Sequence, residues 1–239
     1  MIQELRDLMF LDIETVAQTA DYNALDERLK TQWARKAGFF KRDSDHTDET
    51  IFHDRAGIYA EFGKIVCIAV GKFYDTENGD LGLKTKAYAG DDERELLMEF
   101  KTMVEKLDPF ALKFCAHNGK EFDYPYLCRR MLVNGIPLPP VLNLMGKKTW
   151  EVPHLDTMEM WKFGDFKHYT SLDLLATIFN VPSSKGDMDG SQVNKVYHVD
   201  KDLVKIRDYC LRDVVVLAEL YLKMKTITLN QPLVHKSTE

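Results

Sequence analysis

The chain has 239 residues, of which 45% are hydrophobic and 29% are charged, with a formal net charge of −6 and an isoelectric point near 5.7. This composition is typical of a soluble globular protein and excludes a disordered chain, a collagen-like fibre and a small disulfide-rich scaffold. The acidic balance also argues against a protein that coats nucleic acid non-specifically, because such proteins present a basic face.

The sequence carries no pattern of export or membrane insertion. No apolar run approaches the roughly 18 residues that a membrane helix needs. The first four residues include no basic residue ahead of an apolar stretch, which is the pattern of a signal peptide. We therefore expect neither a secretory signal nor a membrane partner. The cysteines are scattered without a CxxC pair, and we expect buried, reduced thiols in a cytoplasmic protein rather than a zinc site. These cysteines are Cys67, Cys115, Cys128 and Cys210.

The apolar pattern predicts alternating strands and helices, and therefore an α/β domain with a mixed sheet. Apolar and β-branched runs predict strands at 8–14, 64–71, 83–89 and 111–116, with a weaker strand at 152–156. The polar turn at 76–80, which contains Asn78-Gly79, predicts that the second and third strands form a hairpin. Helical spacing of apolar residues predicts helices at 93–107, 126–133, 171–179 and 202–225.

We expect one domain over residues 1–239, with a charged helical insertion at about 15–62. Leu25, Leu29 and Trp33 follow helical spacing within this insertion. The insertion could form amphipathic helices packed against the domain, or a flap over the region beside Asp12. We favour packed helices, because a single helical stripe is weak evidence for a moving element.

The first candidate site residues lie at the end of the first predicted strand. Asp12 and Glu14 are two apart, so both side chains project from the same face. Two carboxylates so placed repel each other unless a cation lies between them, and Mg²⁺ and Mn²⁺ accept such oxygen ligands. Similar acidic pairs occur on protein surfaces, and the apolar run before Asp12 is what favours a site here.

Two further acidic positions follow along the chain. Asp123 lies between a predicted strand and a predicted helix, where functional groups gather in sheets of this class, although it could simply cap the helix. Tyr209 and Asp213 are four apart and share a helical face among apolar neighbours. Two interpretations of Asp213 remain open. If it lies on the buried face of the helix, its charge needs a partner, whereas if it is solvated beside Arg212 it needs none.

The order of these three elements resembles the DEDD 3′–5′ exonuclease superfamily, and the resemblance covers nearly the whole chain. A tyrosine four residues before the last aspartate is typical of the DEDDy branch, since the DEDDh branch has a histidine where this chain has Asp208. Within that branch the chain is most similar to the proofreading exonuclease domain of family-B DNA polymerases. The segments that carry this similarity are His117-Asn118-Gly119, Leu155-Asp156-Thr157-Met158 and the stretch from Lys185 to Ser191.

The resemblance implies a ribonuclease-H-like fold, with a mixed five-stranded sheet flanked by helices. It also implies two divalent metal ions, Mg²⁺ or Mn²⁺, held by Asp12, Glu14, Asp123 and Asp213. Asp12 would bridge both ions, Glu14 and Asp213 would complete the site on the water side, and Asp123 would hold the second ion. Tyr209 would orient the attacking water, because an ordinary tyrosine pKa near 10 makes it a poor base.

Candidate substrate contacts follow from the same resemblance. Thr15 and Val16 would border the terminal nucleotide, and Asn118 and Phe122 would hold its sugar and base. A turn-forming Asn and a core Phe explain the last two equally well. Lys185 would contact phosphate, or would simply be a solvated loop lysine.

A basic–aromatic loop forms a separate feature of the sequence. It contains Lys147, Lys148 and Trp150, and a base could stack on the tryptophan. A tryptophan at the edge of the core is the interpretation that we favour here. His154 and His168 are expected to be structural.

The function expected from these residues is a metal-dependent 3′–5′ exonuclease that shortens single-stranded DNA to 5′-mononucleotides. An exoribonuclease of the same fold is the first alternative, because discrimination depends on how the pocket treats a 2′-hydroxyl. A catalytically silent nucleic-acid-binding module is the second, and it predicts a lost carboxylate and a basic surface. The chain leaves no room for polymerase palm and fingers domains, so we expect a free-standing nuclease or one that works with a DNA polymerase or repair protein in trans.

Overall fold

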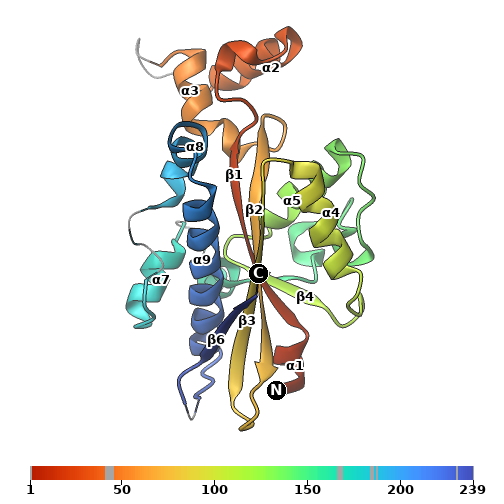
Figure 1. Ribbon diagram of the computed structural model, residues 1–239, viewed down its shortest axis with the longest axis vertical. Helices are drawn as coiled ribbons and strands as arrows, with labels where there is room; N and C mark the ends of the chain where they lie inside the picture. The colour runs from red at the N-terminus through yellow and green to blue at the C-terminus, as the bar shows by residue number, and fades with distance from the viewer. Residues whose placement is uncertain are drawn as a thin grey trace.

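The computed structural model describes residues 2–40, 46–165, 169–183, 186, 188–229 and 231–238. Within these ranges the chain forms a six-stranded mixed sheet in the order β5-β4-β1-β2-β3-β6 (Figure 1). An antiparallel meander makes its centre, and three shorter strands join in parallel at the two sides. The meander is β1 (Leu8–Ala17), β2 (Gly63–Asp75) and β3 (Leu81–Ala89), and the shorter strands are β4 (Lys113–Ala116), β5 (Leu155–Asp156) and β6 (Val234–Thr238).

Helices cover both faces of this sheet (Figure 1). The long helix α9 packs on one face, against β1, β2 and β3, and α4 and α5 pack on the other. The four helices expected from the sequence are present as α4, α5, α7 and α9, with ends that differ from the predicted ones by a few residues. The helices are α1 (Ile2–Arg6), α2 (Glu27–Ala37), α3 (Asp48–Arg55), α4 (Glu93–Val104), α5 (Asp123–Val133), α6 (Thr157–Lys162), α7 (Leu172–Ile178), α8 (Val193–Lys195) and α9 (Leu203–Met224). None of these described helices is long and apolar enough to cross a membrane.

The predicted hairpin is confirmed, because β2 and β3 pair antiparallel across the turn at 76–80. Gly79 has a φ of 80°, a left-handed conformation that glycine adopts without steric penalty. The five expected strands are present as β1 to β5, but the strand count itself is wrong. The sixth strand, β6, pairs with β3 in parallel, and its exposed, mostly polar sequence carries no apolar alternation that would predict it.

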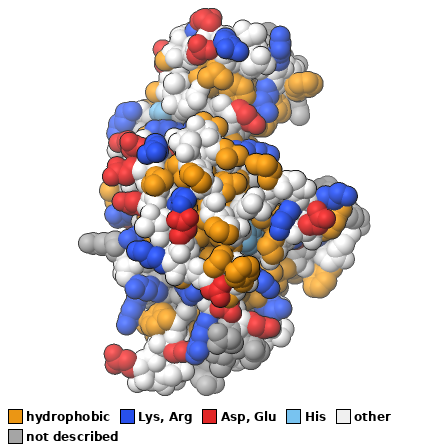
Figure 2. All heavy atoms as spheres, turned by 90° about the vertical axis from the view of Figure 1, so that its right-hand side faces the viewer, with side chains coloured by type: hydrophobic (Ala, Val, Ile, Leu, Met, Phe, Trp, Pro, Cys, Tyr) orange, Lys and Arg blue, Asp and Glu red, His pale blue; other side chains and the backbone are white. Residues whose placement is uncertain are grey.

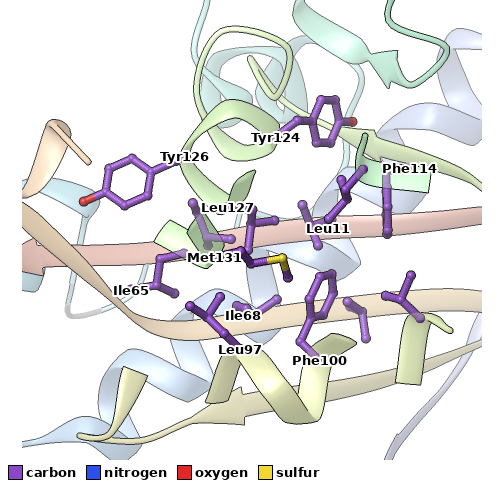
Figure 3. Packing of buried hydrophobic residues seen from close by; sticks show 14 of the residues in the cluster. Leu11, Ile65, Ile68, Leu97, Phe100, Phe114, Tyr124, Tyr126, Leu127 and Met131 are labelled. Atoms are coloured by element: carbon purple, nitrogen blue, oxygen red, sulfur yellow. The ribbon is translucent and has the colours of Figure 1, made fainter. Parts of the chain in front are cut away.

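The core on the α4–α5 face is built from strand residues whose side chains alternate toward these helices. Leu11 of β1 and Ile68 of β2 pack against Leu97 and Phe100 of α4, and Leu127 of α5 closes the layer (Figure 3). All five side chains are almost completely buried. Burial of a Leu, Ile or Phe side chain contributes roughly 1.5–3 kcal/mol, so this layer holds α5 firmly against the sheet.

The opposite core lies between the sheet and α9. Phe10 packs edge-to-face with Phe73 and Tyr221, and Val214 of α9 meets β2 at Gly71. A Cβ on Gly71 would lie only 2.6 Å from Val214 Cγ1. The glycine thus allows α9 to approach the sheet closely.

The insertion forms packed helices, as expected from Trp33. Helices α2 and α3 pack against each other at one end of the molecule (Figure 1). They share a small core in which Trp33 and Phe52 are fully buried and pack edge-to-face. The insertion begins later than predicted, because β1 continues to Ala17. Asn194 and His198 attach this end of β1 to the C-terminal half, since Asn194 Oδ1 accepts the Ala17 amide proton and His198 Nε2 donates to the Ala17 carbonyl.

Candidate active site

A cavity of about 430 Å³ opens beside the carboxyl-terminal half of β1. Strands β1 and β4 run parallel and pair only from Leu8–Lys113 to Phe10–Cys115. Beyond this point the chain after β4 turns into α5 instead of continuing along β1, which leaves the edge of β1 open. Functional groups gather at such carboxyl ends in open α/β sheets. The predicted residues that line this cavity are Asp12, Glu14, Asn118, Phe122, Asp123, Tyr209 and Asp213.

The strand β1 supplies the first two carboxylates. Asp12 and Glu14 lie on the same face as Phe10, as the two-residue period of a strand predicts. Glu14 is buried, whereas Asp12 is partly exposed in the cavity. The strand therefore carries its apolar residues into the core and then brings two carboxylates directly to the cavity.

Asp123 is the first residue of α5 and is 96% buried, with a relative exposure of 4%. The helix N-cap is Phe122 and has no capping side-chain bond, so the capping interpretation of Asp123 is wrong. Its carboxylate instead accepts hydrogen bonds from the backbone N–H groups of Ile13 and Asp123 itself. The bond to Ile13 ties the start of α5 to β1, between Asp12 and Glu14.

Helix α9 brings Tyr209 and Asp213 to the same cavity, one turn apart, as their spacing predicts. Both are buried, and the Tyr209 hydroxyl donates a hydrogen bond to the Asp213 carboxylate. Cys210 lies between them and faces β1, where its thiol is 3.2 Å from Asp12 Oδ2 and 3.5 Å from the Asp12 carbonyl oxygen. Asp12 is thus held by a residue nearly two hundred positions away.

The electrostatics of the cluster follow from burial and mutual repulsion. Burial, followed by the charges of Asp213 and Asp123, raises the pKa of Asp12 well above its usual value. Burial and the charge of Asp12 do the same to the pKa of Glu14. Burial raises the pKa of Asp123 to about 8 despite its two backbone hydrogen bonds. The metal-free protein therefore binds protons on these groups more readily than the unfolded chain does.

This donor set fits a divalent cation. The described residues that line the cavity include no lysine or arginine to balance the carboxylates. Ligand atoms of Asp12, Glu14 and Cys210 lie within 4.8 Å of one another, which is a spacing that one ion can span. Carboxylate oxygens are the ligands of Mg²⁺ and Mn²⁺, and a cation here would remove the repulsion that raises these pKa values.

A loop between β4 and α5 forms the wall opposite β1. Asp156 accepts the amide protons of Asn118 at 2.9 Å and Lys120 at 3.1 Å, and it also caps α6. Asn118 has a φ of 62°, and none of the described residues donates to its buried Oδ1 atom. The hydrogen bonds to Asp156 therefore hold the loop in place, and the Asn118 Oδ1 atom is buried with no donor among the described residues.

His117 lines the cavity but has both ring nitrogens engaged. Its Nε2 donates to the Thr170 carbonyl at 2.8 Å, and its Nδ1 accepts from Thr157 Oγ1 at 2.9 Å. Burial lowers the pKa of His117, so the ring is neutral at physiological pH. His117 therefore links the β4–α5 loop to Thr157 and Thr170, and neither ring nitrogen is free for proton transfer.

Some expected substrate contacts lie elsewhere. Val16 is fully buried beneath α8, so the prediction that it borders a nucleotide is wrong. The pairing of β1 with β2 is irregular between Glu14 and Thr15, and the Thr15 hydroxyl forms a hydrogen bond with Tyr126. Thr15 is not among the residues that line the cavity. Phe122 both lines the cavity and packs against Tyr126. Lys185 lies outside the described residues, as does His168.

Sequence reasoning missed several residues that line the cavity. Tyr169 is 65% exposed and packs edge-to-face with His117. Asp173 and Asp189 add two more carboxylates at the cavity wall. These residues follow no strand or helix pattern that points at β1, and only the path of the chain between β5 and α9 brings them there. Cys210 had been expected only as a buried thiol, which it is.

Comparison with known proteins identifies a family and solved structures of a similar fold. A family model described as a predicted 3′–5′ exonuclease related to the exonuclease domain of PolB matches residues 58–233, a range that includes Asp123, Tyr209 and Asp213. The chain is similar to the family B DNA polymerase from the hyperthermophilic archaeon Pyrobaculum calidifontis, with a TM-score of 0.54 and 18% sequence identity. A search of curated proteins found no match.

The structural similarity covers 90% of this chain and 24% of the polymerase chain. The chain thus spans about a quarter of the length of that polymerase. At this level of identity the similarity concerns the fold, which is the expected ribonuclease-H-like arrangement of a mixed sheet between helices.

Proposed function

Since the chain belongs to the family of predicted 3′–5′ exonucleases related to the exonuclease domain of PolB, we propose that it hydrolyses the terminal phosphodiester of single-stranded DNA and releases 5′-mononucleotides. The observation that carries this proposal is the convergence of Asp12, Glu14, Asp123 and Asp213 on one cavity. They come from a strand, the start of one helix and the middle of another. A silent binding module would have no need to keep all four.

Asp12, Glu14, Asp123 and Asp213 are the residues that would hold divalent metal ions. Two such ions, when bound, would supply an activated water and would stabilise the charge on the leaving oxygen. The four groups form one electrostatic cluster, because the charges of Asp213 and Asp123 act on both Asp12 and Glu14.

Tyr209 would position the attacking water through its hydroxyl. Burial and the nearby charges of Asp213, Glu14 and Asp12 raise the pKa of Tyr209 far above its ordinary value. A phenol with a raised pKa keeps its proton, which the Tyr209 hydroxyl donates to Asp213, and its oxygen would accept a hydrogen bond from the water, so Tyr209 is a positioning group rather than a base.

The terminal nucleotide would occupy the wall formed by Asn118 and Phe122. Asn118 Oδ1 is buried without a described donor, so its side chain would have to turn toward the cavity to accept a hydrogen bond from a sugar hydroxyl or a base N–H group, and that bond would remove the penalty of the buried acceptor. Phe122 offers an apolar face beside it, and the exposed ring of Tyr169 lies across the same cavity.

The test uses single-stranded DNA and RNA oligomers of matched sequence, labelled at the 5′ end, with Mg²⁺ and Mn²⁺ in separate reactions. We expect a ladder of products shortened from the 3′ end and mononucleotides as the released species. Blunt duplex should react more slowly, because the terminal pair must be opened at a stacking cost of ~1–2 kcal/mol per step. Asp12→Asn should abolish the reaction with either metal.

Two results would contradict the proposal. Cleavage of a circular single strand would make the enzyme an endonuclease. A clear preference for the RNA oligomer would assign it to exoribonucleases of the same fold.

A further inference from the structure

A second cavity, of about 380 Å³, lies next to the candidate active site. The loop at 118–122 lines both: Asn118 and Phe122 face the carboxylates, whereas Lys120 lines the second cavity. The rest of its wall is mostly apolar and comes from the outer side of α5, from Leu138 and from the segment at 144–152. From Asp123 to Arg129 the helix rises by about 9 Å, at ~1.5 Å per residue, so the second cavity begins within a few nucleotides of the first.

The charge of this second cavity is opposite to that of the active site. Its described lining contains Lys120, Arg129 and Lys147 and includes no acidic side chain. Lys120 is paired with Glu159 at 2.7 Å, whereas Arg129 and Lys147 are exposed. On the face that Figure 2 shows, which is the α4–α5 side of the molecule, hydrophobic side chains lie interspersed with both basic and acidic side chains.

Trp150 stands beside this cavity and is 75% exposed, so its expected place at the edge of the core is wrong. The Lys148 Nζ lies over its ring, 5.2 Å from the centroid. A short 3₁₀ turn at Thr149–Glu151 projects the ring into solvent instead of folding it onto α5. An exposed indole next to cations is a suitable surface for stacking a nucleic-acid base.

We infer that Lys120, Arg129, Lys147, Lys148 and Trp150, here called the basic–aromatic groove, bind the part of a single-stranded polynucleotide that lies upstream of the terminal nucleotide. The inference rests on the proposed function and extends it from the reacting phosphodiester to the strand behind it. Arg129 and Lys147 contact backbone phosphates, and Trp150 stacks on a base. Charge complementarity and continuity with the active site favour a nucleic acid over a protein partner.

The first experiment compares substrates of different length. A dinucleotide reaches only the active site, whereas a 12-nucleotide strand also reaches the groove. Lys147→Ala/Lys148→Ala should raise the KM for the 12-nucleotide strand about tenfold and leave dinucleotide hydrolysis unchanged. The matched control is Lys106→Ala/Lys113→Ala, which removes two exposed lysines at the opposite end of β4 and should change neither reaction.

The second experiment measures binding without cleavage, with every variant made in the Asp12→Asn background. Fluorescence anisotropy of labelled 12-nucleotide DNA and RNA strands gives the Kd. Trp150→Ala should weaken binding roughly 5- to 150-fold, the range that loss of ~1–3 kcal/mol of base stacking produces, and Trp150→Phe should weaken it less. Removing Lys147 and Lys148 should reduce the slope of log Kd against log salt by about 0.7, the value for the one phosphate contact that Lys147 makes.

The results separate this inference from the proposed function. Absence of hydrolysis of either substrate by the wild-type chain would refute the proposed function, while the binding data still test the groove. If the wild-type chain hydrolyses both substrates but the groove variants keep the wild-type KM and Kd, the proposed function stands and the groove inference is wrong. A protein would then be the partner to test at this surface. Equal effects in the Lys106/Lys113 control would also overturn the groove inference, since any surface charge would then serve.

Discussion

At the scale of single residues, Tyr209 and Asp213 share one face of α9 and a hydrogen bond, yet they have different proposed roles. Asp213→Asn removes a charged ligand at nearly constant volume, and we expect the turnover rate to fall by orders of magnitude. Tyr209→Phe removes one hydrogen bond worth ~0.5–1.5 kcal/mol, which corresponds to roughly a tenfold loss, since ~1.36 kcal/mol of barrier is a factor of ten. Both rates are measured on labelled single-stranded DNA at saturating Mg²⁺.

Thermal melts of both variants and Mn²⁺ titration of Tyr209→Phe are the controls for this comparison. The Phe variant should still bind the metal. An equal or larger loss in Tyr209→Phe would make the hydroxyl an obligatory base, and no loss would make Tyr209 a packing residue.

Cys210 tests whether the orientation of Asp12 matters. Its thiol is a weak donor 3.2 Å from Asp12 Oδ2, and the sulfur is buried. Cys210→Ala should weaken Mn²⁺ binding several-fold, as expected for the loss of ~1 kcal/mol, because Asp12 can then rotate. Cys210→Ser restores a donor and should recover most of the affinity. A serine variant as weak as the alanine variant would show that sulfur packing, rather than the hydrogen bond, is what Asp12 requires.

At the scale of elements, the placement of α9 on the sheet depends on Gly71. Gly71→Ala puts a Cβ 2.6 Å from Val214 Cγ1, next to Asp213, so α9 must shift away from β2. Overpacking of this kind destabilises a protein by ~1–3 kcal/mol, and the shift should also weaken metal binding. The free energy of unfolding from urea titration and the Mn²⁺ affinity are the two measurements.

Gly90→Ala is the matched control for that change, because no described atom lies within 4 Å of a Cβ at this position. It should leave both quantities nearly unchanged. Wild-type stability in Gly71→Ala would mean that Val214 can repack without moving α9.

Elements with strong apolar patterns could be predicted from the sequence, and elements set by tertiary context could not. The strands β1, β2 and β3 and the helices α4 and α9 follow from periodicity, because their burial is what produces the pattern. The edge strand β6 is exposed and depends on β3 for its backbone hydrogen bonds, so its residues carry no signal.

The same distinction applies to the site. The shared face of Asp12 and Glu14, and that of Tyr209 and Asp213, could be predicted because each pair lies within one element. The position of Val16 could not, since the length of β1 depends on its pairing with β2 out to Ala17 and Gly63. The exposure of Trp150 depends on a local turn that hydrophobicity alone does not reveal.

At the scale of the whole molecule, the carboxylate cluster links stability to pH. The pKa of Asp123 is raised to about 8, and those of Asp12 and Glu14 are raised as well, so the folded metal-free protein holds protons that the unfolded chain releases above pH ~4. The free energy of unfolding should therefore fall as pH rises toward 8, by up to ~1.4 kcal/mol per pH unit for each group.

The sharpest window for this measurement is pH 6.5 to 8 in a chelator. Below it, the lowered pKa values of the buried His117 and His154 oppose the effect, since neutral histidines stabilise the fold as pH rises. Asp123→Asn should flatten the slope, and Mg²⁺ at pH 8 should raise the melting temperature. Stability that is constant or rises across this window in the chelator would contradict the raised pKa values.

The parallel pairing of β6 with β3 has a consequence for self-association. Without β6, the β2–β3 hairpin would present a nine-residue strand with unpaired backbone groups along the side of the sheet. Such an edge is a template on which another copy can add a strand, and it promotes aggregation. β6 covers part of this edge with a short, mostly polar strand that carries Lys236 at its centre, and the opposite side ends in the two-residue β5. The two outer strands thus disfavour β-pairing between copies of the chain. A chain cut before Val234 would lack β6, so the edge of β3 would be open to such pairing.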